Sequence, residues 1–228
     1  AFGERYELRG EIARGGMGEI HEAWDSHLRR TVALKVLRAD VAATADELLA
    51  RFVDEAQVTG QLEHPGIVPV YDFGVDDRGR VFYTMPRVRG RDMSAIFELV
   101  ASGSEGWNRA RALGALLSVA ETLSYAHARG VIHRDLKPPN VMIGKFGEVY
   151  VMDWGIARVV RQSGDAVGSE PAEGATIDSL RQDARETPGS PLLTREGAIR
   201  GTPAYMAPEQ ARGDLDEIDA RSDVYALG

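Results

Sequence analysis

Residues 133–140 form a short polar segment whose side chains could handle a phosphoryl group. His133-Arg134-Asp135-Leu136-Lys137-Pro138-Pro139-Asn140 places a carboxylate, an ammonium and a carboxamide within six residues. Asp135 could accept the proton of a hydroxyl nucleophile, and Lys137 could hold a migrating phosphoryl group. Asn140 could supply an oxygen ligand to Mg²⁺, a hard cation that prefers such atoms. Taken alone, the segment could also be an ordinary polar turn.

A second carboxylate follows in Val151-Met152-Asp153-Trp154-Gly155, at the end of an apolar run that reads as a strand. Asp153 is therefore a candidate metal ligand. By itself this segment could also be a polar turn. Two such segments in this order, downstream of Lys35 and Glu55, disfavour that interpretation.

Lys35 ends the segment Val32-Ala33-Leu34-Lys35, whose residue types predict a strand. Strand alternation puts Ala33 and Lys35 on one face. The small side chain leaves room for a flat ring, and the ammonium could reach phosphates. A surface lysine at a strand end is the alternative. Lysine occurs only three times among the 27 basic residues, so a position that holds it could require a compact ammonium.

Glu55 lies on the apolar stripe of a predicted helix, three residues after Phe52 and four before Thr59. A carboxylate that points inward needs a partner, and Lys35 is the natural candidate. A solvated glutamate at the edge of the stripe is the alternative.

A glycine-rich turn, Ile12-Ala13-Arg14-Gly15-Gly16-Met17-Gly18-Glu19-Ile20, joins two predicted strands. Glycines let the backbone approach an anion and present its N–H groups to it. On its own, this turn is better explained as a plain hairpin.

The elements that must position these residues follow from hydrophobic period and turn signals. A helix over 110–129 carries an apolar stripe through Leu113, Leu117 and Leu123. Asp92 could cap a separate, shorter helix over 92–101. The predicted strands are 6–13, 19–25, 31–37, 68–75, 80–86, 141–143 and 149–152, and the predicted helices are 45–62, 92–101, 110–129 and one that begins near 219.

Composition sets further limits. The chain has 228 residues, a net charge of −8 and no cysteine, which excludes a disulfide scaffold or thiolate metal site and argues against a general nucleic-acid binder. No run of about 18 apolar residues predicts a membrane span, and the N-terminus lacks the apolar core of a secretory signal. Residues 160–198, rich in Gly, Ser, Pro, Asp and Glu, are predicted to be a flexible insertion.

Together these motifs resemble the protein kinase family, most closely its bacterial Ser/Thr branch. The glycine-rich turn, Lys35, Glu55, residues 133–140 and 153–155 occur in family order. Gly201-Thr202-Pro203-Ala204-Tyr205-Met206-Ala207-Pro208-Glu209-Gln210 is similar to the segment that receives a peptide substrate, and residues 221–228 are similar to the start of the next helix.

The resemblance implies an α+β, bilobal protein-kinase-like fold. Its N-lobe, residues 1–87, would hold an antiparallel sheet with one main helix. Its mainly helical C-lobe, residues 88–228, would be incomplete, because the family's remaining C-lobe helices are missing and the chain is truncated at the C-terminus.

The same resemblance implies roles for the polar residues. Lys35 would contact the α- and β-phosphates of ATP and pair with Glu55. Asp135 would be the catalytic base, and Lys137 would steady the γ-phosphate. Asn140 and Asp153 would hold Mg²⁺ or Mn²⁺, and Asp223 would brace the catalytic loop.

The ATP pocket is likewise carried over from the family. Met85-Pro86-Arg87-Val88 aligns with the hinge, where the family uses a carbonyl at Pro86 and both backbone groups at Val88. Proline lacks an N–H, but none is required there. The implied ATP-binding residues are Ile12, Gly15, Gly16, Gly18, Ile20, Ala33, Lys35, Met85, Pro86, Val88, Met142 and Met152.

The implied activity is transfer of the γ-phosphoryl group of ATP to protein Ser/Thr hydroxyls, since Lys137 and Thr202 are typical of Ser/Thr kinases. Arg134 is typical of kinases controlled by activation-loop phosphorylation, with Thr194 as the candidate site. Glu209 normally pairs with an Arg from the missing region. A homodimer for trans-autophosphorylation and a cytoplasmic location are expected, and a membrane anchor beyond Gly228 stays open.

Three departures qualify the resemblance. Ala13 replaces the first glycine of the loop, Trp154 replaces the usual Phe, and Pro139 is unusual beside Asn140. A pseudokinase that acts as a nucleotide-binding scaffold is the main alternative function. A small-molecule phosphotransferase is a weaker one, because residues 201–210 are typical of peptide binding.

Overall fold

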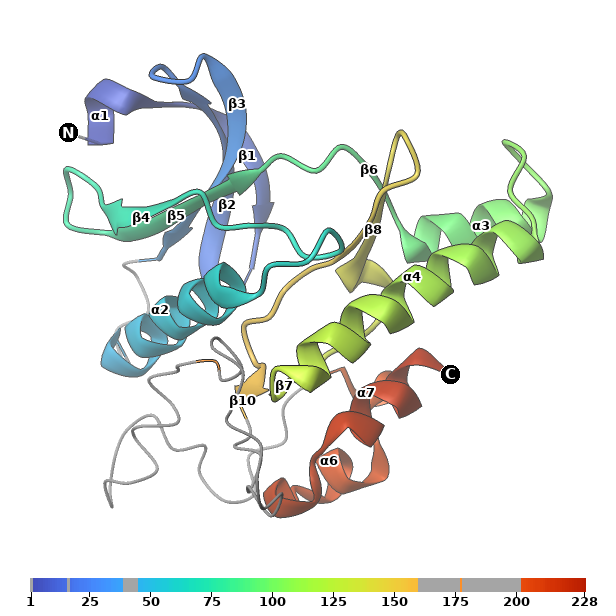
Figure 1. The fold of residues 1–228 in the computed structure, drawn as a ribbon. Coiled ribbons are helices and arrows are strands. Elements are labelled where there is room, and N and C mark those ends of the chain that lie inside the picture. The colour runs from blue at the N-terminus through green and yellow to red at the C-terminus, as the bar shows by residue number, and fades with distance from the viewer. Residues whose placement is uncertain (1, 16, 39–44, 160–176, 178–201) are drawn as a thin grey trace, which may run out of the picture.

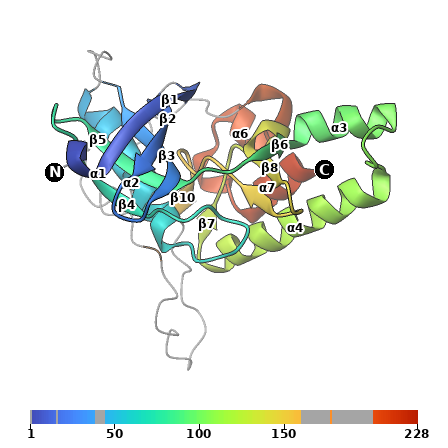
Figure 2. The same ribbon diagram turned by 90° about the horizontal axis from the view of Figure 1, so that it is seen from above.

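The computed structural model describes residues 2–15, 17–38, 45–159, 177 and 202–228. A sheet with one long helix occupies one end of the molecule, and α3, α4, α6 and α7 occupy the other (Figures 1 and 2). The fold is α+β and bilobal. Gly16, Thr194 and nearly all of the predicted insertion at 160–198 lie outside the described residues.

The N-terminal sheet has five antiparallel strands in the order β1-β2-β3-β5-β4. Alternating apolar residues turn one face inward, where Val32, Leu34 and Val36 of β3 pack with Tyr6 and Phe82. A four-residue helix, α1, precedes the sheet. The bounds are α1 Phe2–Arg5, β1 Tyr6–Arg14, β2 Gly18–Asp25, β3 Arg30–Leu37, β4 Asp72–Val75 and β5 Val81–Pro86.

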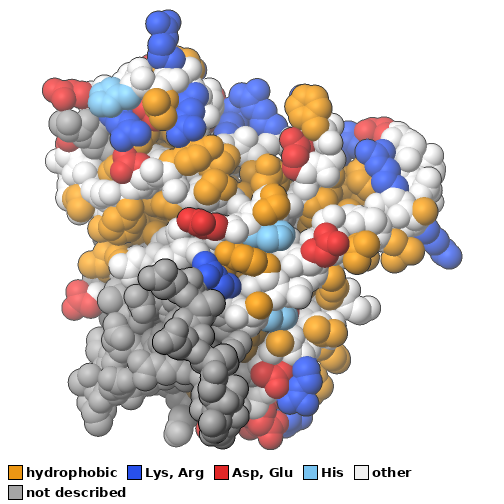
Figure 3. Space-filling model, viewed as in Figure 1, with side chains coloured by type: hydrophobic (Ala, Val, Ile, Leu, Met, Phe, Trp, Pro, Cys, Tyr) orange, Lys and Arg blue, Asp and Glu red, His pale blue; other side chains and the backbone are white. Residues whose placement is uncertain are grey.

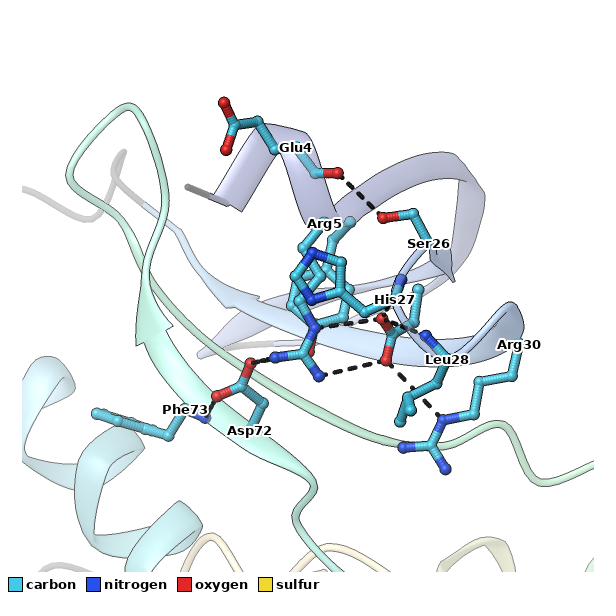
Figure 4. A network of polar contacts seen from close by, with 10 residues as sticks. Glu4, Arg5, Ser26, His27, Leu28, Arg30, Asp72 and Phe73 are labelled. Carbon is cyan, nitrogen blue, oxygen red and sulfur yellow. Dashed lines mark hydrogen bonds and ion pairs between the residues drawn. The ribbon is translucent and has the colours of Figure 1, made fainter.

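A network of polar side chains ties α1 to two strands of this sheet, β2 and β4 (Figure 4). The Arg5 guanidinium donates to Asp25 at 3.2 Å and to Asp72 at 2.8 Å. The Tyr6 hydroxyl donates to the same Asp72 carboxylate at 2.8 Å. Because Asp25 ends β2 and Asp72 begins β4, one arginine fixes two strands that are not neighbours in the sheet.

Helix α2 (Ala45–Gln61) packs against this sheet. Phe52 and Ala56 lie on its buried face and form a small core with Tyr83 of β5. Glu55 lies on the same face, with 3% of its surface exposed. The helix therefore delivers a carboxylate to the face of the sheet that carries Tyr83, opposite the face of Val32, Leu34 and Val36.

The C-terminal part combines helices with two small sheets, β6-β8-β9 and β10-β7. Asp92 caps α3 by accepting from the Ala95 N–H at 2.9 Å. The bounds are β6 Gly90–Asp92, α3 Met93–Ser102, α4 Arg109–Ala128, β7 Val131–Ile132, β8 Val141–Gly144, β9 Val149–Val151, β10 Arg158–Val159, α6 Pro208–Arg212 and α7 Ala220–Leu227, with 3₁₀ turns at Pro138–Asn140, Pro203–Tyr205 and Leu215–Glu217.

One apolar core joins the two parts. Val58 of α2, with Leu62 and Ile67 after the helix, packs with Val119 of α4 and Val151 of β9. The Val151 N–H also donates to the Gly66 carbonyl at 2.8 Å. The strand that precedes Asp153 is thus anchored to the segment that follows α2.

The strand predicted over 68–75 is shorter in the structure, where β4 covers only Asp72–Val75. Pairing with β5 begins at the Tyr71 N–H, which donates to the Thr84 carbonyl at 2.7 Å. Pro69 has no N–H to contribute, which explains why the ladder does not extend further back.

The predicted stripe of α4 was also partly wrong. Leu113 and Leu117 are 64% and 61% exposed, and Figure 3 shows apolar side chains exposed along this helix. The helix instead buries a face rich in small residues, which allows a close approach to the strands beneath it. That face consists of Ala112, Ala115, Val119, Thr122, Leu123 and Ala126.

Candidate active site

Lys35 and Glu55 meet on the face of the sheet that α2 covers, where the ammonium lies 2.5 Å from the Glu55 Oε1 atom. Lys35 belongs to β3 and Glu55 to α2, so the pair joins the helix to the sheet. The site exposes little of either side chain, 12% for Lys35 and 3% for Glu55. In such a setting the ion pair is shielded from water and has a defined geometry.

Gly155 brings Asp153 next to this pair. A Cβ added at Gly155 would lie 2.9 Å from Glu55 Oε2 and 3.2 Å from Asp153 Oδ1. It would also lie 2.7 Å from the Met17 Cε atom, so the turn between β1 and β2 lies close to the segment from Asp153 to Gly155. Only a residue without a side chain allows these groups to approach so closely.

Asp135 lies in the loop between β7 and β8, among three polar neighbours. The Lys137 ammonium donates to its Oδ2 at 2.8 Å, and the Asn140 amide donates to its carbonyl at 2.9 Å. The Thr202 N–H and hydroxyl approach its Oδ1 at 3.0 and 3.2 Å. Lys137 also donates to the Thr202 hydroxyl at 2.8 Å. A hydroxyl group thus already lies beside this carboxylate.

Asn140 and Asp153 are brought together by the β8–β9 hairpin. The Met152 N–H, one residue before Asp153, donates to the Asn140 carbonyl at 2.8 Å. Since the Asn140 amide nitrogen faces Asp135, its amide oxygen remains for a cation. One amide and one carboxylate oxygen fit Mg²⁺, which is usually bound through one or two carboxylates, substrate phosphates and waters. Among the described residues no group of three or more His, Cys, Asp or Glu could hold a metal alone.

Asp223 of α7 holds the chain just before Asp135. Its carboxylate is fully buried and accepts the His133 and Arg134 N–H groups, each at 2.8 Å. It also contacts His127 Nε2 at 2.7 Å. A carboxylate with three partners fixes the backbone at the approach to Asp135.

Two residues of the site adopt the left-handed region that non-glycine residues rarely occupy. The φ angles are 70° for Arg134 and 63° for Asp153. Such conformations cost about 1 kcal/mol or more and persist where the surroundings enforce them. Asp223 fixes the first through the Arg134 N–H.

Trp154 is buried between the two polar loops. Its indole N–H donates to the Val151 carbonyl at 3.2 Å, and its ring meets His133 edge-on at 4.7 Å. His133 Nε2 in turn contacts the Met152 carbonyl at 2.9 Å. Packing and hydrogen bonding account for His133, and the Trp154 hydrogen bond is one that phenylalanine cannot form.

The segment after Thr202 is fastened to the same loop. Gln210 donates to the Arg134 carbonyl at 2.8 Å and accepts from the Ala207 N–H at 3.2 Å. Glu209 accepts a hydrogen bond from Ser222 at 2.5 Å. The helix α6 is therefore joined both to the catalytic loop and to α7.

Several of the residues predicted to line the adenine pocket lie on different strands of the N-terminal sheet. Ile20 pairs with Lys35 across β2 and β3, and Ala33 pairs with Met85 across β3 and β5. The Gly15 N–H closes the glycine-rich turn on the Gly18 carbonyl at 2.9 Å. Gly18 is also required for packing, because a Cβ there would lie 2.6 Å from the Val36 carbonyl oxygen.

The remaining pocket residues are dispersed over the structure. Ile12 is exposed on β1, Pro86 ends β5, Val88 follows it, Met142 lies on β8 and Met152 follows β9. Their contact with adenine stays a prediction.

Three residues of the site were missed by sequence reasoning: Tyr83, Gln210 and Ser222. Tyr83 donates to Glu55 Oε1 at 2.7 Å. Its signal was present, since it precedes Met85 by two residues and so shares a strand face with it. Gln210 carries no such signal, because its partner Arg134 is 76 residues away, and no sequence pattern pairs Ser222 with Glu209.

Comparison with known proteins agrees with this geometry. The protein kinase domain family matches residues 6–228. The chain therefore belongs to the protein kinase family, and the kinase-like fold predicted from the motifs is confirmed.

Curated relatives are bacterial. The chain is 35% identical to the serine/threonine-protein kinase PknD of Protochlamydia amoebophila, over 98% of this chain and 22% of that protein. It is 38% identical to a probable serine/threonine-protein kinase of Streptomyces coelicolor, over 100% of this chain and 29% of that protein. The PknD of Chlamydia pneumoniae is 36% identical over 99% of this chain and 23% of its own length. The chain thus spans about a quarter of these relatives.

Within the described residues, none of the helices has the length and apolar character needed to cross a membrane.

Proposed function

We propose that the protein is a Ser/Thr protein kinase that transfers the γ-phosphoryl group of ATP to protein hydroxyls. The observation that carries this proposal is the arrangement around Asp135. Its carboxylate lies between the Lys137 ammonium at 2.8 Å and the Thr202 hydroxyl at 3.2 Å, on a loop hydrogen-bonded to the strand that leads to Asp153.

Each side chain has a defined task in this reaction. Asp135 receives the proton of the attacking Ser or Thr hydroxyl. The hydroxyl oxygen forms the new bond to the γ-phosphorus, and the bond from that phosphorus to the ADP oxygen breaks. Lys137 faces the migrating group, and Lys35, held by Glu55, faces the α- and β-phosphates.

Asn140 and Asp153 would hold Mg²⁺ or Mn²⁺, which supplies charge neutralisation for the phosphate oxygens when bound. Two protein oxygens suit an ion whose other ligands come from the nucleotide and from water. Since most of the catalysis of phosphoryl transfer is positioning and electrostatics, the buried Lys35–Glu55 pair and the bracing by Asp223 are expected to matter as much as the base.

Thr202 favours Ser/Thr over Tyr substrates. Its hydroxyl and N–H occupy the space beside Asp135 and Lys137, so the reacting hydroxyl must come from a short side chain. Protein substrates, including a second copy of this chain in a transient homodimer, follow from this proposal. A protein that consumes ATP also fits a cytoplasmic location.

Regulation by activation-loop phosphorylation is a further part of the proposal. Arg134 precedes the base, and its backbone is fixed at both ends by Asp223 and Gln210. A phosphate on Thr194 would pair with its guanidinium. We expect Thr194→Ala to lower activity and autophosphorylation at least about fivefold, through loss of about one such charge-assisted contact. Unchanged activity and unchanged phosphate incorporation would exclude Thr194 as the site.

The decisive experiment is transfer of labelled phosphate from ATP in the presence of Mg²⁺. The intact protein should label itself or a general protein substrate, and Asp135→Asn should lose at least about 99% of this activity. Asp216→Asn, which alters an exposed aspartate in the described C-terminal part, is the matched control and should remain active. ATP binding with no transfer by the unaltered protein would contradict the proposal and support a nucleotide-binding scaffold.

A further inference from the structure

The Tyr83 hydroxyl is a polar group in an apolar core, and the proposed reaction assigns it no task. Tyr83 is 4% exposed and packs with Phe52 and Ala56. A phenylalanine would fill the same space without bringing a hydroxyl group into the core. We propose that Tyr83 is a positioning residue that holds Glu55, and through it Lys35, in the geometry used for phosphoryl transfer. This inference rests on the proposed kinase function.

Sheet register places Tyr83 beside Lys35. The two residues are directly paired across β3 and β5, so their side chains leave the same face of the sheet. Glu55 approaches that face from α2. Both side chains converge on one atom, Glu55 Oε1, at 2.5 Å from the Lys35 ammonium and 2.7 Å from the Tyr83 hydroxyl.

Two donors, Lys35 on β3 and Tyr83 on β5, define the position of the Glu55 carboxylate better than a single donor would. A single lysine is a flexible point charge and leaves the carboxylate free to rotate. The tyrosine hydroxyl is at the end of a rigid ring, which is held against Phe52 at 5.2 Å between ring centroids. Among the described residues, Glu55 Oε2 has no hydrogen-bond partner, so the hold on this carboxylate depends on the two contacts at Oε1.

The hydroxyl remains a donor under all ordinary conditions. Burial and the nearby carboxylates of Glu55 and Asp153 raise the pKa of Tyr83 well above its usual value. The phenol is therefore protonated, and the contact is a hydrogen bond from a neutral group to a carboxylate. Bonds of this kind are stronger than those between two neutral groups.

The ring also fills the space behind Met85. The cavity there is only about 30 Å³, with a lining that includes Glu55, Thr59, Val68, Met85, Asp153 and Trp154. Replacement by phenylalanine keeps this packing and removes one oxygen atom. Tyr83→Phe is thus a test of the hydroxyl alone.

Tyr6 provides a matched control. It is also 4% exposed, it belongs to the same sheet, and its hydroxyl donates to the Asp72 carboxylate at 2.8 Å. The same Asp72 carboxylate accepts from Arg5, which also contacts Asp25 (Figure 4), and these contacts involve none of the proposed catalytic residues. Tyr6→Phe should lose a comparable hydrogen bond without disturbing Glu55.

The experiment measures steady-state phosphoryl transfer by the intact protein and its variants. Tyr83→Phe should lower kcat/KM for ATP about tenfold, the expected effect of losing one hydrogen bond to a charged acceptor. The KM for the protein substrate should not change. Tyr6→Phe should remain within about twofold of the unaltered protein.

The same substitution, made in protein that already carries a change at Glu55, distinguishes an effect on the position of Glu55 from a general loss of stability. In Glu55→Ala, which removes the acceptor and is itself expected to have low activity, Tyr83→Phe should change the remaining rate less than twofold, because the hydroxyl acts through the carboxylate. The proposal is overturned if Tyr83→Phe behaves like Tyr6→Phe, or if its full effect persists in Glu55→Ala. It is also overturned if Tyr83→Phe fails to fold while Tyr6→Phe folds. Absence of any Asp135-dependent transfer in the unaltered protein would instead remove the kinase function and this inference together.

Discussion

At the scale of single residues, the site brings together three carboxylates, those of Glu55, Asp135 and Asp153. Within the described part of the chain, none of them shares a cationic side chain with another. Glu55 contacts Lys35 and Tyr83, Asp135 contacts Lys137 and Thr202, and Asp153 lies close to Glu55 across Gly155. Like charges at short range repel unless cations lie between them. In the proposed kinase, a divalent ion at Asp153 would supply positive charge in addition to the two lysines.

Gly155 is the residue where this spacing can be tested. A methyl group there would lie 2.9 Å from Glu55 Oε2 and 2.7 Å from Met17 Cε. We expect Gly155→Ala to lower the rate of phosphoryl transfer at least about tenfold, and to destabilise the protein by about 1–3 kcal/mol through overpacking. Transfer rates and urea unfolding measure the two effects.

Gly114→Ala is the control for that substitution. Gly114 lies in α4, and a Cβ there would meet nothing within 4 Å. Alanine at this helical position should stabilise by about 0.5–1 kcal/mol and leave the rate unchanged. Equal rates for the two variants would show that close approach at Gly155 has no bearing on the reaction.

At the scale of elements, hairpins and strand registers decide which residues meet. Lys35 and Tyr83 are neighbours because β3 and β5 pair in one register. Asn140 and Asp153 are neighbours because β8 and β9 form a hairpin. At its open end, the Met152 N–H donates to the Asn140 carbonyl. A slip of one residue in either pair would turn these side chains to the opposite face.

Asp76 stabilises the hairpin that sets the position of β5. Its carboxylate accepts the Arg78 and Arg80 N–H groups at 2.9 and 2.8 Å and the Arg80 side chain at 2.8 Å. Burial raises the pKa of Asp76, but these bonds to Arg80 and Arg78 outweigh it, and the net effect lowers the pKa.

The pH dependence follows from that shift. A carboxyl whose folded pKa is lowered contributes stability that is complete above its unfolded pKa of about 4 and is lost as pH falls through the folded value. Asp76→Asn should therefore reduce the free energy of unfolding at pH 7, by about 1–3 kcal/mol, and the difference from the unaltered protein should shrink below about pH 4. Urea unfolding between pH 2 and 7 measures it, and a difference independent of pH would refute this role.

Much of the fold could be predicted from period and turn signals, and the exceptions have physical causes. The bounds of β1, β2, β3 and β5 differ little from the predicted ones, whereas β4 is shorter because Pro69 cannot donate to the ladder. The buried face of α4 was mispredicted because its leucines are more hydrophobic than the alanines that pack closely. Tyr83 was missed because an aromatic residue in a strand is ordinary core, and only the register shows it opposite Lys35.

At the scale of the whole molecule, the site lies where the two parts of the fold meet. Lys35 and Glu55 come from the sheet and α2, whereas Asp135, Asn140 and Asp153 come from the loops around β8 and β9. Figure 2 shows the five-stranded sheet at one end of the molecule and α3 at the other, with β8 between them. The core through Val58, Ile67 and Val151 joins the two parts. Displacement of either part would therefore move Lys35, which is proposed to bind phosphates, away from Asp135, the proposed base.

In the proposed kinase, these groups together surround one triphosphate and its divalent ion. The most direct test is binding of Mn²⁺ to the intact protein, followed by electron paramagnetic resonance with and without ATP. The unaltered protein should bind Mn²⁺ at least about tenfold more tightly when ATP is present, since the nucleotide completes the ligand set.

Asp153→Asn should lose most of that gain. Asp214→Asn, which alters a surface aspartate paired with Arg212, should keep it. Mn²⁺ binding that is equally tight without ATP, or that is unchanged in Asp153→Asn, would contradict the account.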